Sequence, residues 1–576
     1  MIDKKPDAAA KQIDPIDSIE GLAQIERSVQ AEMIQDYAKF VLAIAQRPNA
    51  LIEMQKNYWT DQSNILENLS LKAQGQPTPP VAAPAQDDRR FKDPDWNENL
   101  AFDAIKQSYL SAVSHAQGLL KGLDGFDEET RRRIEFNLRQ LSDAVSPTNI
   151  PWMNPEVIRA TIDSRGANLI KGAQHLVDDF VRGGGRLNPE LTDRSAFDVG
   201  RNLATTPGKV VYQNDLMQLI QYAPSTETVR RRPVLIVPSW INKFYILDLS
   251  ERNSFARWLV SEGYTVFIIS WVNPDKRHAD KSLGDYMKMG PLAAIEQITV
   301  LTGEPSINAV GYCIGGSLLA TTLAVMETRN DTRIASATYL ATLVDFSDPG
   351  DMAVFTSDAH LEELERETAR NGYLDASVMA DTFSMLRAND LVWSVAIKSY
   401  FLGQEPPPFD LLYWNSDSTR MPGGLHMSYL RDMYRDNRLV QPGGIVIDGV
   451  PVDLRKIRTP TYILSTREDH IAPWRSTYAA TQIYGGDTVF VLAGSGHVGG
   501  VINPVTSKKY GYWANPSLPS AAEEWLAEAD HTPGSWWVHW QDWVINHAGD
   551  LVPSRHPGGH GSTIEDAPGS YVKCAS

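Results

Sequence analysis

The residues best suited to covalent chemistry lie in the pentapeptide Gly311-Tyr312-Cys313-Ile314-Gly315. A short apolar run typical of a buried strand, 307–310, precedes it, and a helical stretch begins near Gly316. A nucleophile between small residues on a sharp strand-to-helix turn is exposed above a sheet, and the helix N-terminus favours negative charge there. Cys313 is therefore the candidate nucleophile. The alternative is a buried cysteine that fills space in a glycine-rich turn.

An acid and a histidine follow this cysteine in the chain. Asp469 comes directly after a strand-like segment, and His497 comes after the next one, in a loop with glycines on both sides. The order nucleophile, acid, histidine is that of α/β-hydrolases, and it predicts Asp469 as the acid and His497 as the general base. The glycines beside His497 suggest a backbone that approaches another part of the chain closely.

Other interpretations of these residues stay open from the sequence alone. Asp469 could be a helix N-cap, and Glu468 is a rival acid one position away. His497 could be a loop histidine that contacts only solvent. His470 could be the base, but it directly follows the acid, so we expect it to lie next to the catalytic groups and support them without contacting the substrate.

Attack on a carbonyl also requires donors for the developing oxyanion. The amide of Ile314, the residue after the nucleophile, is the first candidate. The second should come from the loop after an early strand, so we expect the amide of Trp240 or Ile241. The alternative for this loop is a surface turn that carries a core tryptophan.

The elements that would position these groups appear after residue 230, where short apolar strands alternate with helical stretches. The expected strands are 233–237, 264–269, 307–310, 335–343, 461–464 and 489–492. This alternation predicts a parallel α/β sheet in an α/β-hydrolase fold. It stops at about 346–457, where an aromatic- and proline-rich stretch predicts a lid or cap insertion. We expect a mostly helical N-terminal domain over 1–200, with a proline-rich linker at about 73–90, and a catalytic domain over 201–576.

Composition excludes several classes of protein. The 576 residues include 54 Lys and Arg against 71 Asp and Glu, a formal charge of -17, which argues against a nucleic-acid partner. With two cysteines, a disulfide framework is not expected. Neither a secretory signal nor a transmembrane run is apparent, so we expect a cytoplasmic protein. The sequence suggests no metal site.

Beyond these motifs, the chain resembles the polyhydroxyalkanoate synthases, which polymerise 3-hydroxyacyl-CoA. The resemblance rests on the box around Cys313, with cysteine where lipases have serine, and on blocks that run along most of the chain: 199–202, 211–215, 238–243, 270–274, 409–415 and 429–431. It implies Cys313 as nucleophile, His497 as general base and Asp469 as third catalytic residue. Two departures are visible, because Ser239 stands where a second proline is expected and Val272 where arginine is expected.

The resemblance is to the long, single-subunit (class I) synthases, and it carries further expectations. It implies release of CoA through a covalent cysteine thioester, with CoA as part of the substrate and no separate cofactor. Tyr312, Ile314 and the chain length suggest short (R)-3-hydroxyacyl groups such as 3-hydroxybutyryl. The helical N-terminal region implies contact with the granule surface and the growing polyester, a homodimer, and no obligate partner of another kind.

Two other classes of protein share some of these features. A thioesterase, esterase or polymer depolymerase would have the same fold and order of catalytic groups, but these enzymes usually carry serine at the turn. A non-catalytic granule-coat protein would not require Cys313, Asp469 and His497 together. Cys313 is therefore the feature that favours the synthase over both.

Overall fold

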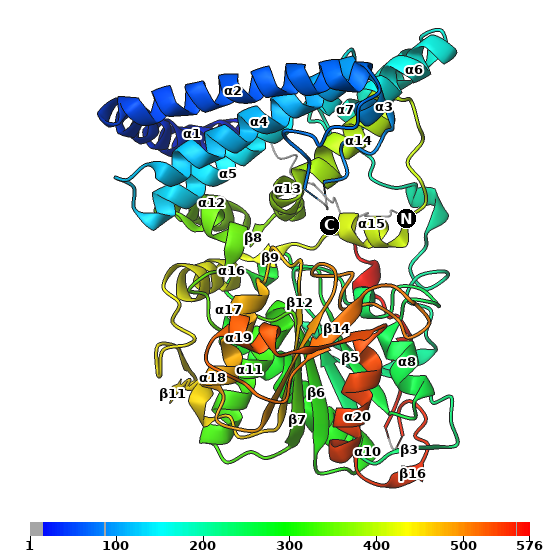
Figure 1. The fold of residues 1–576 in the computed structure, drawn as a ribbon. Helices are drawn as coiled ribbons and strands as arrows, with labels where there is room; N and C mark the ends of the chain where they lie inside the picture. Colours follow the sequence, from blue (N-terminus) through cyan, green and yellow to red (C-terminus); the bar gives the residue numbers. More distant parts are fainter. Residues whose placement is uncertain (1–14, 86–87, 560, 576) are drawn as a thin grey trace, which may run out of the picture.

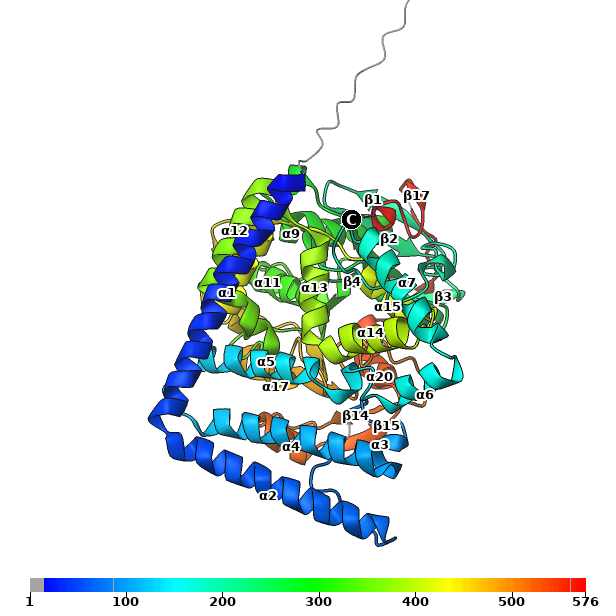
Figure 2. The same ribbon diagram turned by 90° about the horizontal axis from the view of Figure 1, so that it is seen from above.

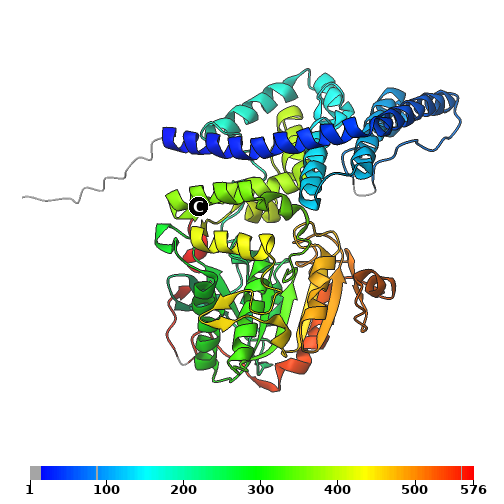
Figure 3. The ribbon, with the colours of Figure 1, turned by 90° about the vertical axis from the view of Figure 1, so that its left-hand side faces the viewer.

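The computed structural model describes residues 15–85, 88–559 and 561–575, which form three stacked parts (Figure 1). A large sheet flanked by helices lies at the bottom of the view. Helices of the predicted cap lie above it, and the N-terminal helices lie above the cap. Figure 3 shows the same succession from the side. The sheet is thus separated from most of the N-terminal helices by the cap.

The sheet confirms the predicted parallel α/β arrangement. Within the described residues it has eleven strands, and its central order β13-β12-β7-β6-β4-β5 is parallel throughout. These six strands are β4 (Val234–Val237), β5 (Val266–Trp271), β6 (Ile307–Tyr312), β7 (Ile334–Leu340), β12 (Thr461–Thr466) and β13 (Thr488–Ala493). All six expected strands are present, with ends that differ by a few residues.

Alternation along the strands builds a core on each face of the sheet. In β4, Leu235 and Val237 join one core with side chains of α10 (Ala293–Thr302) and α11 (Ile314–Thr328). Val234 and Ile236 join the other, which includes α8 (Phe255–Ser261) and α20 (Trp536–Ala548). Successive side chains of a strand point to opposite faces, so a continuous apolar run is what a sheet covered on both sides requires.

Antiparallel strands extend the parallel centre at both edges. On one side follow β2 (Met217–Tyr222), β1 (Gly208–Gln213) and β17 (Glu565–Asp566), and on the other β14 (Gly511–Ala514) and β15 (Asp530–Pro533). In β17, Asp566 pairs with Lys209 of β1, so the end of the chain returns to the start of the sheet region. These additions are not evident from the alternation of strands and helices.

The predicted cap insertion is present between β7 and β12. Its main helices are α12 (Asp358–Asn371), α13 (Ala376–Leu386), α15 (Asp410–Ser416) and α16 (Gly423–Tyr429). The first two begin at side-chain N-caps, since Ser357 accepts from the amide of His360 and Asp375 from that of Ser377. The cap lies at the end of the sheet where β6 gives way to α11.

The main N-terminal helices are α1 (Pro15–Gln46), α2 (Pro48–Ala73), α4 (Leu100–Gly122), α5 (Glu128–Ala144), α6 (Pro155–Asp163) and α7 (Ala167–Arg182). Of these, α1, α5 and α7 make the main contacts with the cap, and α2 packs on α4. In Figure 2, α1 runs along α12 while α4 and α5 lie across the molecule. On α7, the Asn168 amide donates to the Phe401 carbonyl at 2.8 Å, and Asp179 accepts from the Tyr400 hydroxyl at 2.7 Å. After α2, the described residues of 74–85 and 88–94 contain no helix, and the Val81 amide in this segment donates to Gln107 of α4 at 2.8 Å.

Candidate active site

Cys313 lies on a strained turn between β6 and α11. Its backbone has φ 54° and ψ -127°, a conformation that residues other than glycine rarely adopt. The chain around it is crowded, because a Cβ on Gly311 would lie 2.5 Å from the Cα of Gly316, and one on Gly315 would overlap the backbone oxygen of Val237. The predicted need for small neighbours at this turn is therefore confirmed.

Asp469 lies just beyond β12 with its carboxylate enclosed by donors. One oxygen accepts from the amides of Ile471 and Ala472 at 2.9 and 2.8 Å, and the other from the Thr466 hydroxyl at 2.9 Å. The second oxygen also lies 2.7 Å from Nδ1 of His497. The neighbouring Glu468 is exposed. Of the two candidate acids, the structure brings Asp469 to the histidine.

His497 lies in the loop after β13, between Asp469 and Cys313. Its ring packs beside that of Tyr312, with 5.6 Å between centroids. A Cβ on the nearby Gly500 would lie 2.8 Å from the Gly494 carbonyl, which confirms the close backbone approach expected of this loop. The backbone of this loop is therefore closely packed near the ring.

The charges of this pair support one another. Burial works to lower the pKa of His497, but the Asp469 carboxylate and then Cys313 outweigh it and raise that pKa well above its ordinary value. For Asp469, burial works to raise the pKa, but His497 and the hydrogen bonds from Ala472 and Thr466 outweigh it and hold the pKa low. An imidazolium beside a carboxylate is thus the favoured state of the pair.

The loop after β4 carries the second predicted oxyanion donor. The amide of Ile241 donates to the Ser239 hydroxyl at 3.1 Å. Of the two candidate oxyanion donors, the amide of Trp240 is therefore the one that remains available. The Trp271 indole donates to the Pro238 carbonyl at 2.9 Å, and Thr419 of the cap donates to the Trp240 and Ile241 carbonyls at 3.0 and 2.6 Å. Ile314 opens α11, where its amide has no carbonyl of a preceding turn to bond.

His470 is next to this group but not hydrogen-bonded into it. Burial, followed by the charge of Arg387, lowers the pKa of His470 to about 4, so the ring is neutral near neutral pH. Its Nδ1 is buried without a hydrogen-bond partner among the described residues. The structure thus places His470 beside Asp469 without giving it a direct bond to the acid or to His497.

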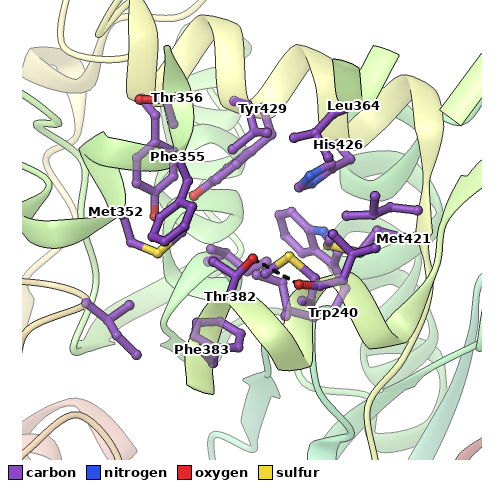
Figure 4. A pocket seen from close by; sticks show the side chains of 18 of the residues that line it. Trp240, Met352, Phe355, Thr356, Leu364, Thr382, Phe383, Met421, His426 and Tyr429 are labelled. Carbon is purple, nitrogen blue, oxygen red and sulfur yellow. Dashed lines mark hydrogen bonds between the residues drawn. The ribbon is translucent and has the colours of Figure 1, made fainter. Parts of the chain in front are cut away.

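Cys313 lines a mostly apolar pocket together with residues of the cap, several of which are labelled in Figure 4. About 760 Å³ of empty space lies between its walls, part of it open to solvent. Trp240, Ile241, Cys313 and Ile314 form its floor, and the cap supplies most of the remaining lining: Met352, Phe355, Thr356, Leu364, Leu374, Val378, Met379, Thr382, Phe383, Met421, His426, Tyr429, Leu430 and Tyr434. An acyl group attached to the thiol would lie among these apolar side chains.

Several residues of this site have no sequence signal of their own. Thr466 and Thr419 are ordinary threonines in sequence, and only the fold brings them to Asp469 and to the loop after β4. Trp271 belongs to a recognised block, but its bond to Pro238 depends on the pairing of β4 with β5. Among the described residues, no group of three or more His, Cys, Asp or Glu side chains is arranged to hold a metal ion.

Comparison with known proteins identifies the family. A model described as the N-terminus of poly-beta-hydroxybutyrate polymerase (PhaC) matches residues 87–259, and the alpha/beta hydrolase fold model matches 232–504. A poly(3-hydroxyalkanoate) polymerase of Methylorubrum extorquens is 44% identical over 558 residues, which cover 96% of this chain and 91% of that protein. The chain belongs to the poly(3-hydroxyalkanoate) polymerase family.

Two further members of the family are also similar over most of the chain. The polymerase subunit PhaC of Rhizobium meliloti (strain 1021) is 48% identical over 85% of this chain and 80% of its own length. The polymerase subunit PhaC of Cupriavidus necator is 40% identical over 91% of this chain and 89% of its own length. These comparisons confirm the resemblance found in the sequence, the α/β-hydrolase fold and the assignment of the chain as an acyltransferase.

Within the described residues, no helix has the length and apolar character needed to cross a bilayer.

Proposed function

We propose that this poly(3-hydroxyalkanoate) polymerase joins short (R)-3-hydroxyacyl groups, such as 3-hydroxybutyryl, through a covalent thioester on Cys313, releasing CoA at each addition. The observation that carries the proposal is the position of the thiol, on a strained turn next to a buried His497–Asp469 pair and at the floor of an apolar pocket. A nucleophile, its proton carrier and an orienting acid are the parts that acyl transfer requires.

In the first step, the Cys313 sulfur attacks the thioester carbonyl and forms a new C–S bond. The bond to the CoA sulfur breaks, and the departing thiolate takes the proton that His497 has received from Cys313. The raised pKa of His497 suits this role, because its imidazolium can hold the proton until CoA leaves. The amides of Ile314 and Trp240 are our candidates to bind the carbonyl oxygen. One thioester replaces another, so the acyl group stays reactive.

In the second step, the 3-hydroxyl of another hydroxyacyl-CoA attacks the acyl-Cys313 thioester. An ester bond forms, the C–S bond to Cys313 breaks, and the hydroxyl proton passes to His497. His497 then either protonates the Cys313 sulfur or keeps the proton, forming an ion pair with the thiolate. The lengthened acyl-CoA can then acylate Cys313 again with loss of CoA. Atoms and charges balance in each cycle.

Asp469 acts in this scheme as a positioning residue. Its side chain has 0% exposure, and its oxygens are occupied by two amides, a threonine hydroxyl and His497. A carboxylate without exposed surface is poorly placed to meet a substrate hydroxyl. This arrangement supports orientation of His497 over direct deprotonation of the 3-hydroxyl.

The proposal also includes a helical domain over 1–200 and a catalytic domain over 201–576. It further includes action at the surface of polymer granules and assembly as a homodimer. Exposed apolar side chains on α6 and α7 support contact with an apolar polymer: Ile162, Ile170, Val177, Phe180 and Val181. The homodimer rests on the family resemblance.

The experiment that tests the proposed function measures CoA release from (R)-3-hydroxybutyryl-CoA and identifies the acyl product in the same reaction. We expect CoA together with insoluble polyester, and neither from the Cys313→Ala variant. Free 3-hydroxybutyrate as the main product would identify a thioesterase and contradict the proposal. Polymer from longer hydroxyacyl-CoA alone would contradict the short-chain preference.

A further inference from the structure

The polar side chains of the pocket above Cys313 are mostly committed to the protein. The hydroxyl of Thr356 donates to the Ala353 carbonyl, and that of Thr382 to the Val378 carbonyl, both at 2.9 Å. The Tyr429 hydroxyl donates to Ser317 at 3.3 Å. Each of these hydroxyls has already used its one proton, so it can only accept a hydrogen bond from a ligand.

His426 differs from them. It lies on α16, is only 6% exposed, and its imidazole points into the pocket (Figure 4). Its imidazole makes no hydrogen bond to any described residue. Burial lowers the pKa of His426 to about 4, so the ring is neutral near neutral pH and carries one N–H donor and one nitrogen acceptor. Because the ring is largely buried while its nitrogens are open to the pocket, it is suited to bond a ligand or a water that enters there.

The position of His426 shows which part of an acyl substrate it would meet. His426 comes from α16 of the cap, whereas Trp240, Cys313 and Ile314 line the same pocket from the side of the sheet. The imidazole therefore faces the space that an acyl group on Cys313 would occupy, and the thioester carbonyl is left to the amides of the floor.

We propose that His426 is a substrate-binding residue that hydrogen-bonds the 3-hydroxyl of the hydroxyacyl group and so selects hydroxylated acyl groups over plain fatty acyl groups. The inference rests on the proposed function and names what the pocket recognises. A hydroxyacyl group has two acyl oxygens, and the carbonyl oxygen is assigned to the floor. The remaining hydroxyl both donates and accepts, as neutral imidazole does.

An acyl group without the hydroxyl would fill the same apolar space but leave His426 unpaired. Sites built to bond a hydroxyl reject analogues that lack it, because their own buried polar groups lose a partner. We expect about a 10- to 100-fold preference for the hydroxylated group, corresponding to one buried hydrogen bond that water partly replaces in the analogue.

The test compares single-turnover acylation of Cys313 by (R)-3-hydroxybutyryl-CoA and by butyryl-CoA, followed by intact-protein mass after rapid quenching. The ratio of the two rates is the readout, because both substrates meet the same protein and loss of folded enzyme cancels. We expect the ratio to fall about tenfold or more in His426→Leu and to be partly kept in His426→Asn, which retains a donor and an acceptor. Met421→Leu, an apolar change in the same pocket, is the matched control and should leave the ratio unchanged.

Three results would overturn the inference. The ratio could stay unchanged in His426→Leu, or it could be near one in the unaltered enzyme. It could also collapse in Tyr434→Phe while surviving in His426→Leu, which would assign the hydroxyl to Tyr434. Failure of the proposed function would look different, because the unaltered enzyme would then acylate Cys313 with neither substrate.

Discussion

At the scale of single residues, the proposed mechanism depends on a buried carboxylate, Asp469, that orients His497 and does not contact the substrate itself. Asp469 holds His497 through a 2.7 Å bond, and Thr466, Ile471 and Ala472 hold Asp469. The ring can therefore present its other nitrogen to Cys313 in one orientation. The cysteine in turn owes its exposure to a turn that only small neighbours permit.

Replacing Asp469 by Asn should remove this support without emptying the space it fills. The pKa of His497 would lose the charge that raises it, and burial would then lower it. We expect Cys313 acylation and elongation to fall together, by about 10²- to 10⁴-fold, as for loss of general-base assistance. Rapid-quench acylation and steady-state CoA release measure the two steps. Glu468→Gln, on the exposed neighbour, should change neither, and a loss confined to elongation would place Asp469 on the 3-hydroxyl instead.

The same pair should make stability depend on pH. His497 has a raised pKa, so its contribution is complete below its unfolded pKa of about 6.5 and is lost as pH rises through the folded value. Asp469 has a lowered pKa, so its contribution is present above about 3.9 and is lost as pH falls through the folded value. Between about pH 3.9 and 6.5 both contributions are present, so thermal unfolding should show the largest destabilisation of His497→Gln near pH 5–6. We expect the free energy of unfolding to fall by roughly 3 kcal/mol, as for a broken buried ion pair. A loss that does not diminish at any pH up to the alkaline unfolding of the protein would contradict a charged pair.

At the scale of elements, the cap helps to shape the catalytic floor as well as cover it. The segment before β9 (Met421–Pro422) supplies Thr419, whose hydroxyl holds the carbonyls of the loop after β4. Trp414 of α15 also reaches this region, since its indole donates to the Lys243 carbonyl at 2.8 Å. A movement of the cap would therefore change the position of the Trp240 amide.

Thr419→Val should test this link, because valine has nearly the same shape but no hydroxyl. With the loop less well fixed, we expect kcat for CoA release to fall about tenfold, less than the roughly 10²- to 10³-fold loss of a whole oxyanion donor. The neighbouring Ser418→Ala is the control, since its hydroxyl is bonded only weakly, at 3.5 Å, to Asn415 in its own turn. Activity of Thr419→Val equal to that of Ser418→Ala would show that the loop needs no support from the cap.

At the scale of the whole molecule, the N-terminal helices brace the cap. On α7, Gly172 lies so close to the cap that a Cβ there would overlap the main-chain oxygen of Tyr400. Hydrogen bonds to Phe401 and from Tyr400 lie beside this contact. A cap held in this way can keep water from the acyl thioester, which polymerisation requires.

Gly172→Ala should push α7 away from the cap, because the atom it would strike is backbone and cannot rotate aside. We expect a lower Tm and a larger share of free 3-hydroxybutyrate among the products, since a looser cap admits water. Gly118→Ala on α4 is the matched control, because a Cβ there meets nothing within 4 Å and alanine favours a helix by about 0.5–1 kcal/mol. Product ratios equal to those of the control would show that α7 does not govern the cap.

The sequence predicts much of the catalytic layer because its signals are local. Each strand, each helix and the turn at Cys313 is indicated by a few neighbouring residues, and the order of Cys313, Asp469 and His497 is read directly along the chain. The structure shows the parallel sheet, the strained turn and the Asp469–His497 hydrogen bond. What remained open depends on contacts between distant segments. The choice between the Trp240 and Ile241 amides turns on one hydrogen bond of Ser239, and the position of His426 turns on how the cap folds over β6.

The central claim is that Cys313 carries the growing acyl chain, and one measurement tests it most directly. The enzyme is mixed with one equivalent of (R)-3-hydroxybutyryl-CoA, quenched in acid within milliseconds, and digested for peptide mass analysis. The account predicts one hydroxybutyryl group on the peptide containing Cys313, removable by hydroxylamine and absent from Cys313→Ser at the same time point. Polymer formation by an enzyme whose Cys313 peptide stays unmodified at every time point would contradict it.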